Sequence, residues 1–136
     1  MADKFRSTVK VVELEVNDNG DIIKLPLSDE NFIKRFYDFI TNIQDKSKEL
    51  DAKKVKDLPD TEIIQKDIEF HEYLKEEFIK LFGDGSYEKV FGENVLVSVE
   101  YVLEFIEACT PYIEKHTEER LEKFSKYSAN RQGSSL

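Results

Sequence analysis

Apolar and polar residues alternate near the N-terminus, in "VELEVNDNGDIIKLPL" at residues 12–27. A period of two indicates a half-buried strand, and Asn19-Gly20 suits the two positive-φ positions of a type I′ turn. The predicted cross-strand pairs are Val16 with Ile23, Leu14 with Leu25, Val12 with Leu27 and, on the opposite face, Glu15 with Lys24. Because two strands alone are marginally stable, the apolar face of a hairpin over about residues 9–27 must pack on other elements.

After the hairpin, apolar residues recur every three to four positions, which is the period of an amphipathic helix. Helices are predicted over about residues 28–50, 60–82, 86–91 and 94–126. The predicted helix boundaries are an N-cap at Ser28, a C-terminal glycine at Gly83, an N-cap at Ser86, a stop at Gly92 and an N-cap at Asn94. In the second helix the predicted apolar stripe includes Ile64, Ile68, His71, Leu74, Phe78 and Phe82. Pro111 is expected to kink or split the last helix, because proline removes a backbone hydrogen bond.

These elements predict an α+β fold that is predominantly α-helical, with an N-terminal β-hairpin packed on three to four helices. With 136 residues the chain suffices for one domain, predicted over residues 1–127. The lysine-rich segment that ends at Pro59 is expected to be a helical extension followed by a mobile surface loop. Residues 128–136, "SANRQGSSL", contain little that could be buried and are expected to form a disordered tail.

The charge of the chain limits its partners. Its net charge is −9 and its pI is near 4.8, so it lacks the excess of basic residues with which proteins bind nucleic acid or anionic membranes. The N-terminus has no apolar signal region, and the sequence has no run of apolar residues long enough to span a membrane. We therefore expect a cytoplasmic protein. The single cysteine, Cys109, lies among apolar residues at helical spacing and is expected to be a buried structural thiol.

Motifs that would indicate chemistry are incomplete in this chain. "FGDGSYEKVFGEN" lacks the lysine of a Walker loop and the third glycine of a dinucleotide loop, and "NDNGD" has Ile22 where a calcium loop needs glycine. In "EFHEYLKEE", His71-Glu72 is followed by Lys75 where a zincin needs histidine. We therefore expect no catalytic residue, no cofactor and no metal site, and we do not expect an enzyme.

A binding function remains, and aromatic residues are its candidates. Tyrosine and phenylalanine are enriched at the centres of protein interfaces, where a rigid ring buries much area at low entropic cost. The candidate partner-binding residues are Tyr87, Phe91, Tyr101, Phe105 and Tyr112. The alternative is that these rings pack the short helix on the last one. The acidic surface would give orientation and a fast association rate with a basic partner.

The order of these parts resembles a known family. The carrying stretches are "IIKLPLSDENFIKRFYDFI", "LFGDGSYEKVFGEN", "VEYVLEFIEACTPYIEKH" and the polar end "KYSANRQGSSL". Together they are similar to the tail assembly chaperones of siphophages and prophages of Gram-positive bacteria. The resemblance implies a non-enzymatic protein of the host cytoplasm that binds the tape measure protein, keeps it soluble and aids tail tube assembly. Such a task requires an exposed apolar groove that binds a helix.

Two other classes of function stay open. A structural virion component, such as a head–tail connector or a minor tail protein, would use its surface for permanent homo-oligomerisation, with a self-complementary patch that closes a ring. A small acidic inhibitor or regulatory protein would instead concentrate carboxylates on one face and bind a single enzyme.

Overall fold

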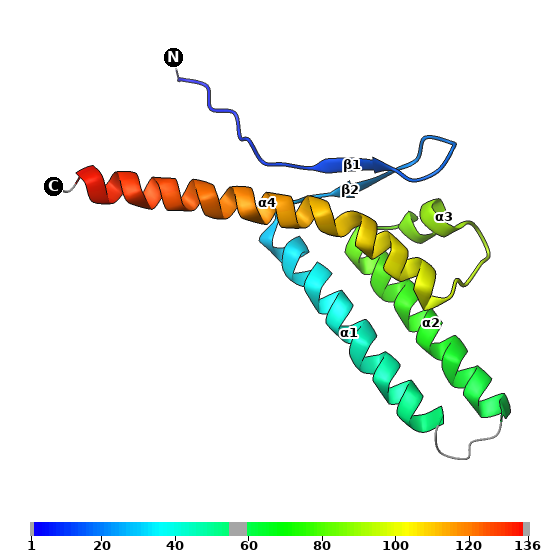
Figure 1. Ribbon diagram of the computed structural model, residues 1–136. Helices are drawn as coiled ribbons and strands as arrows, with labels where there is room; N and C mark the ends of the chain where they lie inside the picture. Colours follow the sequence, from blue (N-terminus) through cyan, green and yellow to red (C-terminus); the bar gives the residue numbers. More distant parts are fainter. Residues whose placement is uncertain (1, 55–59, 135–136) are drawn as a thin grey trace. The chain divides into compact units, whose positions relative to one another are not determined.

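The computed structural model describes the backbone of residues 2–54 and 60–134, and the side chains of residues 2–49 and 60–128 (Figure 1). The elements are β1 (Val12–Glu15), β2 (Ile22–Leu25), α1 (Glu30–Lys54), α2 (Asp60–Phe82), α3 (Ser86–Phe91) and α4 (Val99–Ser134). The predicted class, a mostly helical α+β fold with an N-terminal hairpin, is confirmed. The chain divides into two compact units, of which the first ends at Val102 and the second begins at Leu103, inside α4.

The hairpin forms, but its register differs from the predicted one by two residues. Val12 pairs with Leu25, Leu14 with Ile23 and Glu13 with Lys24. A shift of two residues keeps every side chain on its face, because the side-chain period of a strand is two. The apolar face is therefore as predicted: Ile23 and Leu25 are buried and Val12 and Leu14 are half-buried, while Glu13 and Lys24 are exposed.

The shift arises because the connecting loop comprises residues 17–20 in place of a two-residue turn at 19–20, so the centre of the loop lies one residue earlier. The N–H of Val16 donates to the carbonyl oxygen of Asp21 at 3.0 Å, which leaves four residues between these two. Asn17 organises them, since its Oδ1 accepts from the N–H groups of Asn19 at 2.9 Å and Asp21 at 3.3 Å. Gly20 takes the left-handed conformation at φ 80°. An asparagine side chain that bonds the backbone two residues ahead is a turn former, and it replaces the predicted type I′ turn.

Helix α1 begins two residues later than predicted, and a different residue caps it. Asp29 Oδ1 accepts from the N–H of Asn31 at 2.9 Å, which is the bond of an N-cap. Ser28 is engaged elsewhere, because its hydroxyl oxygen accepts from the N–H of Lys10 at 2.7 Å. The prediction that Ser28 is the cap is therefore wrong. Helix α1 extends to Lys54, and residues 55–59, the rest of the segment predicted to end in a loop at Pro59, lie outside the described residues.

The core of the first unit lies where α1, α2, α3 and β2 pack together. Its buried apolar side chains, up to the end of α3, are Ile23, Leu25, Leu27, Phe32, Phe36, Phe39, Ile43, Phe70, Leu74, Phe78, Leu81 and Tyr87. The bounds of α2 and α3 are those predicted. The apolar stripe of α2 is only partly right, because Ile64 and Ile68 are 59% and 39% exposed and Phe70 takes the buried position instead.

Glycines end α2 and α3 as predicted. Gly83, at φ 104°, follows α2 and donates its N–H to the carbonyl oxygen of Ile79 at 2.8 Å. Gly92, at φ 107°, closes α3. The N-cap of α3 is Gly85, and Ser86 is instead a buried first residue of the helix, so the prediction of a Ser86 cap is wrong.

Helix α4 starts later and ends later than predicted. Asn94 has φ 57° and lies outside the helix, which begins at Val99. The helix continues through Pro111 without splitting and reaches Ser134, so residues 128–134 are helical and not part of a disordered tail. Over the described part of the chain, none of the helices combines the length and the apolar character that crossing a membrane demands.

Candidate protein-binding surface

An aromatic cluster joins α2 and α3. The ring of Tyr87 packs edge-on against Phe78, with the ring centres 5.7 Å apart, and lies 4.9 Å from the ring of Phe91. Phe82 lies 4.7 Å from Phe78 and, across the core, 6.3 Å from Phe32 of α1. Such offset and edge-to-face pairs stabilise beyond their buried area. The cluster fixes the short helix α3 on the end of α2.

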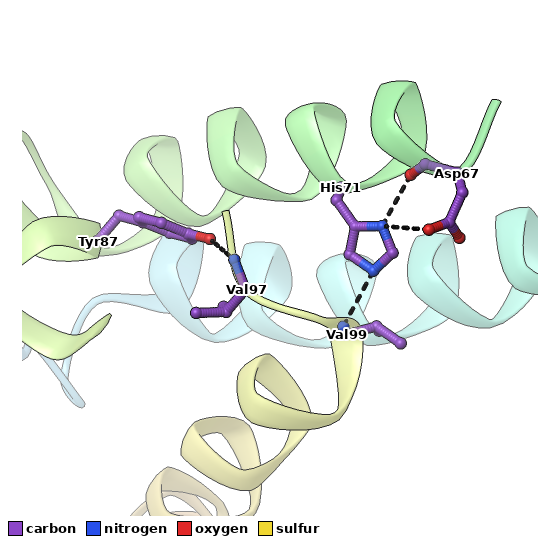
Figure 2. Close-up of polar contacts among 5 residues, drawn as sticks. All are labelled: Asp67, His71, Tyr87, Val97 and Val99. Atoms are coloured by element: carbon purple, nitrogen blue, oxygen red, sulfur yellow. Dashed lines mark hydrogen bonds and ion pairs between the residues drawn. The ribbon is translucent and has the colours of Figure 1, made fainter. Parts of the chain in front are cut away.

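The hydroxyl of Tyr87 also positions the chain that leads into α4 (Figure 2). The N–H of Val97 donates to Tyr87 Oη at 2.8 Å. Two residues on, the N–H of Val99 donates to Nε2 of His71 at 3.1 Å. Val99 opens α4, so its N–H is one of the helix donors that no backbone carbonyl satisfies. Two side chains from α2 and α3 thus satisfy the backbone at the start of α4.

The histidine tautomer follows from its two contacts. Nδ1 of His71 lies 2.7 Å from the carbonyl oxygen of Asp67, which can only accept, so Nδ1 carries the proton. Nε2 is then the acceptor that Val99 requires. The carboxylate of Asp67 lies 3.7 Å from the same Nδ1. The sequence placed His71 in the apolar stripe of the second helix, and its hydrogen bond with a backbone N–H 28 positions later leaves no mark in local spacing.

The five predicted partner-binding residues differ in their exposure. Tyr87 is 1% exposed and belongs to the core, with Phe91 half-buried beside it. Tyr101 and Tyr112 are 54% and 42% exposed, and Phe105 is half-buried. Of the five, Tyr101 and Tyr112 are exposed, and the role of all five in binding stays a prediction.

A different set of apolar side chains is more exposed, on the second unit. Ile106, Cys109 and Ile113 of α4 are buried, as was expected for Cys109. Further along the same helix the apolar residues are open to solvent: Leu121 is 57% exposed, Phe124 69% and Tyr127 62%. We call these three residues the distal α4 face. Their spacing of three places them along one side of the helix over two turns.

The charges around the distal α4 face are balanced. Residues 114–126 carry the acidic side chains Glu114, Glu118, Glu119 and Glu122 and the basic side chains Lys115, Arg120, Lys123 and Lys126. Nζ of Lys126 lies 3.9 Å from Oε1 of Glu122, which is one turn earlier in the helix. This segment is neutral within a chain whose net charge is −9. An apolar stripe flanked by charges of both signs is typical of a helix that pairs with another helix.

The thiol of Cys109 is a further candidate for chemistry. Burial raises the pKa of the Cys109 thiol to about 12, so it stays protonated and unreactive at neutral pH, as expected of a structural cysteine. Within residues 2–49 and 60–128, no group of three or more His, Cys, Asp or Glu side chains is arranged to hold a metal ion.

Comparisons with known proteins place the chain in a family. A search of curated proteins and a search of solved structures each found no match. A family profile, however, matches residues 19–135, which extend from the hairpin loop to the last residues of the chain. The match therefore includes α1, α2, α3 and α4. The protein belongs to the family described as "Family of unknown function (DUF6673)".

Proposed function

We propose that this protein is a non-enzymatic binding protein that holds a long helical partner on the distal α4 face. The observation that carries the proposal is the exposure of Leu121, Phe124 and Tyr127 along one side of a helix. Exposed apolar residues that are grouped, unlike single scattered ones, mark interaction sites. A helix is the partner that fits best, because it can follow the stripe over successive turns and pair its own charges with the mixed charges beside it.

The resemblance of the sequence to tail assembly chaperones suggests which helical partner is bound. We propose the tape measure protein, held in soluble form in the cytoplasm of the host during phage assembly, with tail tube protein as a further partner. Tape measure proteins are long, and the family resemblance implies that chaperones coat them. A neutral apolar stripe on an otherwise acidic molecule supports this role, since the net charge of −9 helps to keep the complex in solution.

Co-purification tests the proposal. The tagged chain is expressed together with the long helical protein encoded next downstream, and the soluble fraction is captured through the tag. We expect the untagged protein to stay soluble and to elute with the tagged chain. Substitution of Leu121→Ala with Phe124→Ala should abolish the capture, because the two changes remove most of the apolar area of the stripe.

A matched control distinguishes binding at the distal α4 face from non-specific hydrophobic binding. Ile64 of α2 is 59% exposed, as much as Leu121, but lies on a different helix. Ile64→Ala should leave the capture unchanged. A partner that precipitates with the wild-type chain would contradict the proposal, and so would equal loss in the Ile64 and α4 variants. Elution of the chain alone as a discrete ring would instead favour the head–tail connector.

A further inference from the structure

The N-terminal arm, residues 2–11, has a strand-like pattern without a strand partner. It forms neither helix nor strand and leads away from β1 (Figure 1). Phe5, Val9 and Val11 are 90%, 69% and 49% exposed. These three residues occupy odd positions, whereas the exposed basic residues Lys4 and Arg6 occupy even ones. In an extended chain this alternation gives one apolar face and one basic face.

Strand β1 has an edge that could receive such an arm. The sheet contains two strands among the described residues, so β1 is paired on one side only. Val16 bonds to Asp21 across the hairpin, and bonding in an antiparallel pair alternates along the strand. Glu13 and Glu15 therefore direct their backbone N–H and C=O groups away from β2. An exposed row of unpaired backbone groups is a template for another strand.

The two faces of β1 complement the two faces of the arm. Glu13 and Glu15 lie exposed on one face, and Val12 and Leu14 lie half-buried on the other. We propose that the N-terminal arm of one copy of the chain adds to the free edge of β1 in a second copy. In the antiparallel register that matches both faces, Arg6 lies opposite Glu13, Phe5 opposite Leu14 and Lys4 opposite Glu15. Opposite charges and apolar pairs facing each other across strands each stabilise a sheet.

A second copy is the occupant because the chain cannot reach its own β1 edge in this structure. The N–H of Lys10 donates to the hydroxyl of Ser28 at 2.7 Å, and the N–H of Ser28 donates to the carbonyl oxygen of Lys10 at 3.3 Å. Lys10 is therefore held beside the segment that follows β2. A return of residues 4–6 along β1 would need a tight reversal at this point, which would break these bonds.

The pairing is not reciprocal. A symmetric exchange about a two-fold axis perpendicular to the sheet would place residues of the same parity opposite each other, and thus Phe5 opposite Glu13 or Glu15. The charge pattern disfavours that arrangement. Each copy would instead donate its arm to one neighbour and receive an arm from another, which is a heterologous contact that closes a ring or continues as an open chain.

Cysteine cross-linking tests the register. In a Cys109→Ala background, chains that carry Arg6→Cys are mixed with chains that carry Glu13→Cys and oxidised. We expect disulfide-linked dimers from the mixture, because paired residues in neighbouring strands have Cα atoms about 5.5 Å apart, as a disulfide needs. A chain with both substitutions should give a ladder of multimers. Arg6→Cys mixed with Ile22→Cys, on the other strand, is the matched control and should remain unlinked.

The same experiment can overturn the proposal. Dimers from Arg6→Cys alone would show that two arms pair with each other, and an internal disulfide in the double variant would show that the arm binds its own strand. Absence of any cross-link would show that the arm does not bind β1. Charge reversal gives an independent measurement: Glu13→Lys with Glu15→Lys should reduce the sedimentation mass, and adding Lys4→Glu with Arg6→Glu should restore it. Failure of this restoration would exclude the charge pairing.

Discussion

The aromatic cluster of α2 and α3 and the distal α4 face use the same kinds of residue in opposite environments. Phe78 is fully buried, with the rings of Phe82, Tyr87 and Phe91 around it. Phe124, on an equally regular helix, is 69% exposed. Helical spacing predicts an apolar stripe in both places. What differs is whether other side chains cover that stripe, and spacing alone does not contain this information.

This difference separates stability from binding. Rings that are buried in the folded chain stabilise it, and they have no exposed area that a partner could bury. Exposed rings contribute little to folding and gain that energy only when a partner covers them. Substitutions in the two regions should therefore affect different measurements, and four predictions follow this division from the largest effect to the smallest.

The largest expected effect is on the alkylation rate of Cys109, which is 0% exposed in the folded chain. Alkylation by iodoacetamide at pH 8 should be slower in the native chain than in urea by at least roughly a hundredfold, because only opened molecules expose the thiol. Mass spectrometry over time measures both rates. Equal rates would show that this part of α4 is uncovered in solution.

The burial of Cys109 should also appear in the pH dependence of the free energy of unfolding. Because the pKa of Cys109 is raised from 9.0 to about 12 in the folded chain, the unfolded thiol loses its proton first. The free energy of unfolding should thus fall as the pH rises from about 9 to about 12. Urea melts across this range compare the wild-type chain with Cys109→Ala, whose decline should be shallower. Parallel declines would contradict a buried thiol.

Paired phenylalanine substitutions come next. Phe78→Ala should lower the free energy of unfolding by ~3–5 kcal/mol, because it leaves a cavity in the aromatic cluster. Phe124→Ala should change it by no more than ~0.5 kcal/mol, as for other surface substitutions. Urea denaturation followed by circular dichroism measures both. A large effect at Phe124 would place the distal α4 face in the core and remove the basis of the proposed function.

Paired tyrosine substitutions give the smallest contrast. Tyr87→Phe keeps the ring but leaves the N–H of Val97 without its acceptor, so we expect a loss of roughly 1–2 kcal/mol. Tyr112→Phe removes a hydroxyl from a ring that is 42% exposed and should be nearly neutral. Hydrogen exchange at Val97 should also accelerate in the Tyr87 variant alone. Unchanged exchange there would show that the hydroxyl does not hold the chain before α4.

The hairpin shows which features the local pattern predicts and which it does not. Alternation decides which residues face the core, so the predicted apolar face survives a register shift of two residues. The register itself depends on whether Asn19-Gly20 forms a two-residue turn or Asn17 closes a longer loop, and this choice is made partly by tertiary contacts. Nδ2 of Asn17 donates to the carbonyl oxygen of Lys89 at 3.0 Å, in a helix 72 residues away.

The sequence by itself determined the elements that depend on local energetics. Glycines at positive φ ended α2 and α3 where predicted, because the residue that must turn left-handed is set by its neighbours in the chain. Tertiary structure decided everything that depends on distant partners. The side chains of His71 and Tyr87 accept hydrogen bonds from backbone N–H groups at the start of α4, far from them in the sequence. Ile113 is buried, whereas Leu121 on the same helix is exposed. Burial is a property of pairs of elements, and no single stretch of sequence specifies both members.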